Sequence, residues 1–188
     1  MSISLEQQYK TLSLCGIKLR PGLSVEHLLA SFDRETFEEE PYTLLLTLMG
    51  RELEVEPFEK VSDDIWCFDV ECIEDHNDYA RIAERLRDLA GESFPLEDIK
   101  DYVDVEEQQA WLSFRLDGED YKWTASVVHD YADPEILSQL AQLYADRNTG
   151  KRFTMFDLGG QACLIGCSTP DQLTKLAERT QLKFEWLT

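Results

Sequence analysis

Three stretches of the chain carry apolar residues at the spacing of an α-helix. The first runs from about Asn77 to Ala90 and has charged residues on its opposite side. The other two begin where an N-cap residue is followed directly by proline, which is favoured at the first helical position. These two starts are Asp133-Pro134 and Thr169-Pro170. A further helix capped by Ser24 leads us to expect a helical N-terminal segment over residues 1–40.

Alternation of apolar and polar residues predicts a β-hairpin around Asp117-Gly118. These two residues are typical of a two-residue turn, which sets the register of the strands on either side. The expected pairs are Phe114 with Tyr121, Leu112 with Trp123, Ala110 with Ala125 and Arg115 with Asp120. The apolar pairs then share one face of the hairpin, and Trp111 lies on the other face.

A second hairpin is predicted to turn at Gly159-Gly160, and both of its faces are apolar. Its expected pairs are Phe156 with Cys163 and Met155 with Leu164. A strand pair that is apolar on both sides is buried on both sides or lies at an interface. Residues 152–167 are therefore also a candidate seam of a homodimer.

The remaining apolar segments are shorter or less regular. Residues 65–72 alternate as a strand, and residues 183–187 predict a last strand. The leucine-rich run 42–49 is interpreted as a strand, with a helix as the alternative, and Leu53 and Val55 indicate a short partner strand. Residues 96–102 are expected to form a short helix or an irregular loop.

This order of elements predicts an α+β protein. Two strands followed by a helix recur as ββα units from residue 42 onward, which gives an antiparallel or mixed sheet with helices mainly on one face. Residues 65–156 also follow the β-α-β-β-α-β order of ferredoxin-like folds. Because no long linker rich in Gly, Pro or Ser interrupts the chain, we expect a single domain over residues 1–188, with a weak seam near residue 150.

Composition adds a large negative charge to this picture. The 188 residues include 38 acidic and 18 basic side chains, for a net charge of −20. A field of this sign repels nucleic acids and anionic membranes and attracts basic proteins. No apolar run approaches the length of a membrane-spanning helix. The odd number of cysteines, with no export signal, predicts free thiols and a cytoplasmic location.

The candidate chemical residues stand alone and form no known catalytic, metal or cofactor motif. Cys167 precedes a predicted helix start, where backbone N–H groups can lower a thiol pKa. His129 adjoins Asp130 as a general base would adjoin its carboxylate. Asp69 and Glu71 share one face of a predicted strand, an arrangement that suits a cation. The simpler interpretations are a buried thiol, a capping residue and a polar outer sheet face.

Trp111 is the candidate residue for direct contact with a partner protein or a ligand. It lies beside Arg115, Lys122 and Thr124 on the outer face of its hairpin, and outward aromatic residues are frequent at binding surfaces. The alternative is that another segment of the chain covers it.

The leading hypothesis is a non-enzymatic binding or inhibitor module for a basic protein partner. Small acidic inhibitors such as bacterial immunity proteins combine long-range attraction with a few aromatic contacts, and the analogy rests on charge and size alone. One alternative is a small enzyme or small-molecule-binding protein with a pocket between sheet and helices, using Cys167, His129 or His76. Another is a self-associating structural protein joined through residues 152–167.

Overall fold

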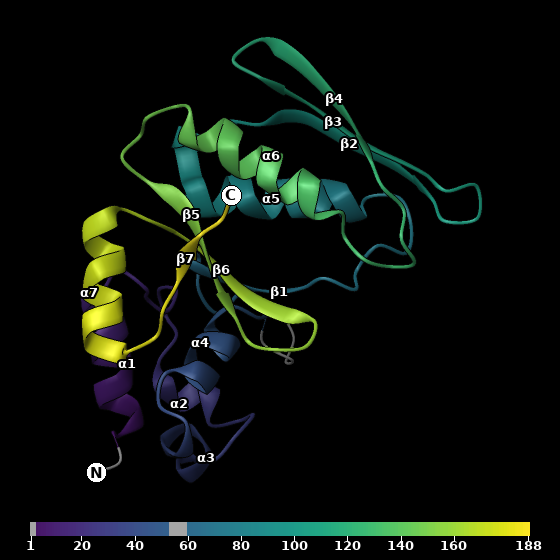
Figure 1. Cartoon of the computed structure of the whole chain (residues 1–188). Helices are drawn as coiled ribbons and strands as arrows, with labels where there is room; N and C mark the ends of the chain where they lie inside the picture. The colour runs from purple at the N-terminus through teal and green to yellow at the C-terminus, as the bar shows by residue number, and fades with distance from the viewer. Residues whose placement is uncertain (1–2, 53–59) are drawn as a thin grey trace. The chain divides into compact units, whose positions relative to one another are not determined.

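A computed structural model describes residues 3–52 and 60–188 of the chain (Figure 1). The chain divides into two compact units, which are described separately below. Unit 1 comprises residues 1–68 and 154–185, and unit 2 comprises residues 69–153 and 186–188. One boundary, after Phe153, lies close to the seam expected near residue 150. That residues 1–188 form a single domain stays a prediction.

Helices and two sheets confirm the predicted α+β class. The helices are α1 (Leu5–Leu14), α2 (Val25–Leu28), α3 (Arg34–Glu39), α4 (Thr43–Met49), α5 (Asp78–Ala90), the 3₁₀ turn η1 (Gly91–Ser93), α6 (Pro134–Ala145) and α7 (Pro170–Thr180). The strands are β1 (Ile65–Asp69), β2 (Glu97–Asp104), β3 (Gln109–Leu116), β4 (Glu119–Ala125), β5 (Arg152–Asp157), β6 (Ala162–Ser168) and β7 (Glu185–Trp186). Among the described residues, no helix is long and apolar enough to cross a membrane.

The strands lie in two separate sheets. One has the order β1-β6-β5-β7, and the other is the antiparallel sheet β2-β3-β4. The ferredoxin-like order is not confirmed, because the strands between residues 65 and 156 are divided between these two sheets. All three helices predicted from residue 77 onward are confirmed as α5, α6 and α7.

The β3–β4 hairpin forms with the predicted register. Its pairs include Phe114 with Tyr121, Leu112 with Trp123, Ala110 with Ala125 and Arg115 with Asp120. Asp117 and Gly118 have φ angles of 52° and 85°, which is the positive-φ geometry of a two-residue type I′ turn. Local turn chemistry therefore set the register of this hairpin.

The expectation of a helix or irregular loop at residues 96–102 is wrong, because this segment is strand β2. It pairs with β3, and only Val103 on it is fully buried. A register shift between Glu97 and Lys100 accompanies a positive φ of 51° at Asp98. An edge strand with a single buried apolar residue has only a weak alternation of apolar and polar positions. Residues 97–104 therefore form a strand because they pair with β3.

The preferred interpretation of residues 42–49 as a strand is also wrong, since they form helix α4. Tyr42, Leu45, Leu46 and Met49 are buried, and their spacing is that of one face of a helix. Leucine and methionine also favour helices intrinsically. The expected partner strand at Leu53 and Val55 lies outside the described residues.

The second predicted hairpin is confirmed as β5 and β6, but its loop is longer than predicted. The N–H of Leu158 donates to the carbonyl of Ala162 over 3.1 Å, which leaves three residues in the loop instead of two. The expected pairs of Phe156 with Cys163 and of Met155 with Leu164 assumed the shorter loop and are not confirmed. Gly159 and Gly160 both have positive φ, as glycine allows. Leu164 and Ile165 are fully buried, so burial within the chain accounts for the apolar character of β6.

The N-terminal segment is helical as expected, and the buried side chain of Gln8 ties it into the core of unit 1. Its amide donates to the carbonyls of Ile3 and Phe37 over 2.9 and 2.8 Å, and its oxygen accepts from the Tyr42 N–H over 2.9 Å. A buried side-chain amide is stable only with its partners in place. Gln8 therefore links α1 to α3 and to the residue that precedes α4.

In unit 2, α5 and α6 lie on the same side of the sheet β2-β3-β4 (Figure 1). The buried face of β3 presents Ala110, Leu112, Phe114 and Leu116. The rings of Phe94, Tyr144 and Phe153 pack together in the same core, with centroids 4.8–6.2 Å apart. The opposite face of the sheet carries the outward residues of all three strands.

Replacing Gly50 with alanine should destabilise the protein by about 1–3 kcal/mol, because the new Cβ has no room. It would clash with the backbone nitrogen of Cys67 and lie 2.8 Å from the carbonyl carbon of Trp66. Backbone atoms of β1 cannot move aside without distorting the sheet. Urea unfolding measures the change.

Gly166→Ala is the matched control for Gly50→Ala. Its Cβ would meet the side-chain oxygen of Thr154 at 3.2 Å, a contact that a small rotation relieves. An equal loss of stability in both variants would contradict the steric explanation.

Candidate functional site

The outer face of the sheet β2-β3-β4 carries a row of large side chains. Tyr102 on β2 is paired with Trp111 on β3, and Trp111 is paired with Thr124 on β4. Residues paired across antiparallel strands share a face. The next row contains Lys100, Ser113 and Lys122. Tyr102 and Trp111 are half-buried, so the rings keep part of their surface in solvent.

Three rings on this face form a continuous stack, which we call the aromatic platform: His76, Tyr102 and Trp111. The ring of Tyr102 lies 6.2 Å from that of Trp111 with an interplanar angle of 12°. The ring of His76 lies 4.9 Å from Tyr102 at 36°. The ammonium of Lys122 lies 4.0 Å from the Trp111 ring centroid. The platform thus already binds a cation from its own chain.

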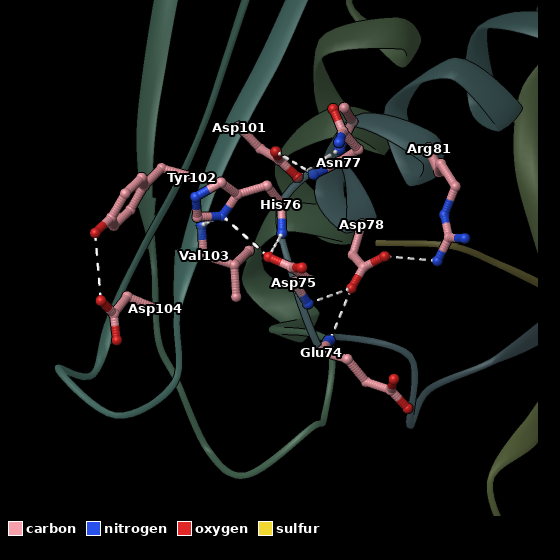
Figure 2. Close-up of polar contacts among 11 residues, drawn as sticks. Glu74, Asp75, His76, Asn77, Asp78, Arg81, Asp101, Tyr102, Val103 and Asp104 are labelled. Carbon is pink, nitrogen blue, oxygen red and sulfur yellow. Dashed lines mark hydrogen bonds and ion pairs between the residues drawn. The ribbon is translucent and has the colours of Figure 1, made fainter.

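The turn before α5 brings His76 to β2 (Figure 2). Its Nδ1 accepts a hydrogen bond from the Val103 N–H over 3.3 Å, and in this arrangement the ring carries its proton on Nε2. Asn77 follows with a φ of 78°, a left-handed conformation that asparagine tolerates better than most residues. The sharp turn at Asn77 lets the chain enter α5 directly after His76.

Two carboxylates hold this turn in place by accepting backbone N–H groups (Figure 2). Asp101 on β2 accepts from Asn77 and Ala80 over 2.6 and 3.1 Å. Asp78 accepts from the N–H groups of Glu74 and Asp75 over 2.7 and 2.8 Å and also binds Arg81. The first N–H groups of a helix lack partners within the helix, so Asp101 satisfies donors at the start of α5.

Acidic residues of the turn before α5 and of the β2–β3 loop lie at the His76 and Tyr102 end of the platform, and we call Asp75, Asp104, Glu106 and Glu107 the acidic margin. Asp75 lies 3.5 Å from Nδ1 of His76, and Asp104 accepts from the hydroxyl of Tyr102 over 3.3 Å. The negative charge of Asp104 raises the pKa of Tyr102, and Glu107 adds to the same effect. Partly exposed rings in a negative field favour a cationic ligand.

Of the residues predicted to bind, Trp111 belongs to the platform, and Asp69 and Glu71 do not. The expectation that Asp69 and Glu71 share a strand face is wrong, because β1 ends at Asp69. The Asp69 carboxylate accepts from the N–H of Glu71 over 3.0 Å, as in an Asx turn. The chain therefore turns between the two carboxylates.

His129 and Cys167 also lie outside the platform. His129 is exposed in a turn of unit 2 and has a φ of 55°. Cys167 lies on β6 in unit 1, ahead of α7. A capping box already pairs backbone groups at that helix start: Thr169 N–H donates to the Gln172 side chain, and Gln172 N–H donates to Thr169 Oγ1.

The sequence does not single out Tyr102, and for His76 it indicates a loop or capping residue, with a general base as the alternative. Tyr102 lies in the segment expected to be a helix or a loop, so its outward position on a strand was not visible. His76 reaches the platform only through the pairing of its turn with Val103, which is 27 residues away. The alternation of Lys100, Tyr102 and Asp104 with Val103 was the available signal.

Within residues 3–52 and 60–188, no three His, Cys, Asp or Glu side chains are grouped to hold a metal ion. No protein-family model, curated protein or solved structure matched the chain. The function of the site therefore has to be inferred from its geometry.

Replacing Asp101 with alanine should lower the free energy of unfolding by about 1–2 kcal/mol, because two N–H groups lose their acceptor. Glu106→Ala, at an exposed acid of the same unit, should change stability by less than about 0.5 kcal/mol. Denaturant unfolding measures both variants. Equal effects would mean that Asp101 contributes charge and not capping.

Two thiols should resist alkylation in the folded protein. Burial raises the pKa of Cys72 to about 11 and that of Cys163 to about 12. Because the thiolate reacts, labelling at pH 8 should be more than about a hundredfold slower than in unfolded chain, and should accelerate as the pH rises. Timed labelling with iodoacetamide and peptide mass spectrometry tests this. Equal rates in the folded and unfolded protein would contradict the burial.

Proposed function

We propose that this protein is a non-enzymatic binding module for a basic protein partner, which it recognises through the aromatic platform and the acidic margin. The observation that carries the proposal is the stack of His76, Tyr102 and Trp111, with an ammonium 4.0 Å from the Trp111 ring centroid. An arginine or lysine of the partner would find the same chemistry.

Charge and rings have different roles in this proposal. A net charge of −20 draws a basic protein from a distance and raises the association rate. Exposed ion pairs add little affinity, about 0–1 kcal/mol each. Partly buried aromatic residues contribute more, and Trp, Tyr and Arg dominate binding energy at interfaces. The platform is therefore expected to set the lifetime of the complex, and the margin its rate of formation.

Further observations favour binding over the rival hypotheses. His76 already has a structural role in the turn before α5, because its Nδ1 accepts from the Val103 N–H and its ring stacks on Tyr102. Self-association through residues 152–167 would need exposed apolar surface, yet Phe153, Leu164 and Ile165 are fully buried. We place the module in the cytoplasm, since all five cysteines are free thiols.

Trp111→Ala should weaken the complex about 30-fold, in line with the loss of a central aromatic contact worth about 2 kcal/mol. The partner is first isolated by affinity capture at low salt and released at high salt. Calorimetry with the purified partner then measures the affinity of each variant. Capture of no basic protein, or unchanged affinity for Trp111→Ala, would refute the proposal.

A matched pair of charge variants separates the margin from overall charge. Glu106→Gln/Glu107→Gln and Glu39→Gln/Glu40→Gln each remove two negative charges, from exposed positions in units 2 and 1. The first pair should slow association several-fold more than the second, and stopped-flow mixing measures the rates. If both pairs of substitutions slow association equally, the attraction comes from the net charge of the protein and not from the acidic margin.

A further inference from the structure

Unit 2 has an apolar pocket of about 400 Å³ where the chain leaves β4 and enters α6. Its walls are formed by Val70, Ser126, Val128, Tyr131, Ala132 and Pro134, with Asp133 at the start of the helix. Val128 and Tyr131 are 59% and 39% exposed, which is unusual for large apolar side chains in a folded chain. This pocket lies apart from the residues that define the aromatic platform.

Hydrogen bonds within unit 2 already shape the pocket. The N–H of Ala132 donates to the Val70 carbonyl over 2.7 Å, and the N–H of Tyr131 donates to the Val128 carbonyl over 3.2 Å. The Asp133 carboxylate accepts from the N–H of Ser126 over 2.6 Å and is 9% exposed. Because these polar groups are paired, the pocket offers mainly apolar surface, and its walls are preorganised for a ligand.

Acidic residues adjoin this apolar surface. Asp69 and Glu71 flank Val70 in sequence, Asp130 precedes Tyr131, and Glu135 follows Pro134. Neither lysine nor arginine adjoins a residue of the pocket wall. Three residues singled out by sequence (Asp69, Glu71 and His129) are thus next to residues of the pocket wall along the chain. An apolar group would enter it most favourably from a positively charged segment.

The pocket begins directly after β4 ends at Ala125. Thr124, which is paired with Trp111, is followed two residues later by Ser126 and four residues later by Val128. Ser126 and Val128 are exposed, so the pocket wall begins two residues along the chain from a residue that is paired with Trp111.

We propose that the pocket receives one large apolar side chain of the basic partner, next to basic residues in the partner's sequence. This inference rests on the proposed function and specifies how the partner is held. Interfaces typically combine such an apolar anchor with a surrounding polar rim. Here the acids around the pocket form that rim.

Three tripeptide amides test the pocket directly: acetyl-Lys-Leu-Lys-amide, acetyl-Lys-Ser-Lys-amide and acetyl-Glu-Leu-Glu-amide. Each is titrated into the full ¹⁵N-labelled chain at constant ionic strength, and amide shifts are followed by NMR. The Lys-Leu-Lys peptide should give saturable shifts at Val128, Tyr131 and Ala132. The serine peptide should bind about tenfold more weakly, because the leucine side chain is lost. The acidic peptide should not bind.

Val128→Ser should lower the affinity for the Lys-Leu-Lys peptide. Val105→Ser, at another exposed valine, should leave that affinity unchanged. Three results would overturn the inference: no saturable shifts at the pocket, equal binding of the acidic peptide, or concentration-dependent shifts at Val128 without peptide. The last would identify a second copy of the chain as the occupant. None of these results depends on Trp111, so failure of the pocket and failure of the platform are distinguishable.

Discussion

Capture of unpaired backbone N–H groups by carboxylates holds unit 2 in its observed arrangement. Asp101 reaches from β2 to the start of α5, and Asp78 closes the turn before that helix. Asp133 accepts from Ser126 and Glu135, and its own N–H donates to the Tyr79 hydroxyl, which joins the end of β4 to both helices. An unpaired donor at a helix start is costly when shielded from water, so each carboxylate stabilises one junction. These acids contribute to the net charge, but their oxygens are already committed to the backbone.

Both helices are thereby held on one face of the sheet β2-β3-β4, and the aromatic platform lies on the other face. The junctions also decide where the remaining charge lies. The acidic margin follows the turn before α5 and the loop after β2, so that carboxylates and rings meet at one edge. Negative charge alone would attract many basic proteins with low affinity. Aromatic side chains next to the charge add contacts that can favour one partner over the others.

The platform and the apolar pocket share this origin, since the bonds of Asp133 shape the pocket wall and the start of α6 together. A site built on strands and capped helix starts loses little conformational freedom when a partner binds. Water is largely excluded from the junction between β4, α5 and α6, because burial of the Tyr79 side chain there raises its pKa to about 12. Recognition would then depend on side chains that are already in position.

The sequence by itself determined the elements with local signals. Proline at two helix starts and Asp117-Gly118 between alternating strands predicted α6, α7 and the β3–β4 register, because turn and cap geometry depend on neighbouring residues. It also placed Trp111 on the outer face. Only the tertiary structure decided that residues 97–104 form a strand, that residues 43–49 form a helix, and that His76 stacks on Tyr102. Those outcomes depend on pairing and burial between residues far apart in the chain, and the short local patterns of these segments did not by themselves decide between helix, strand and loop.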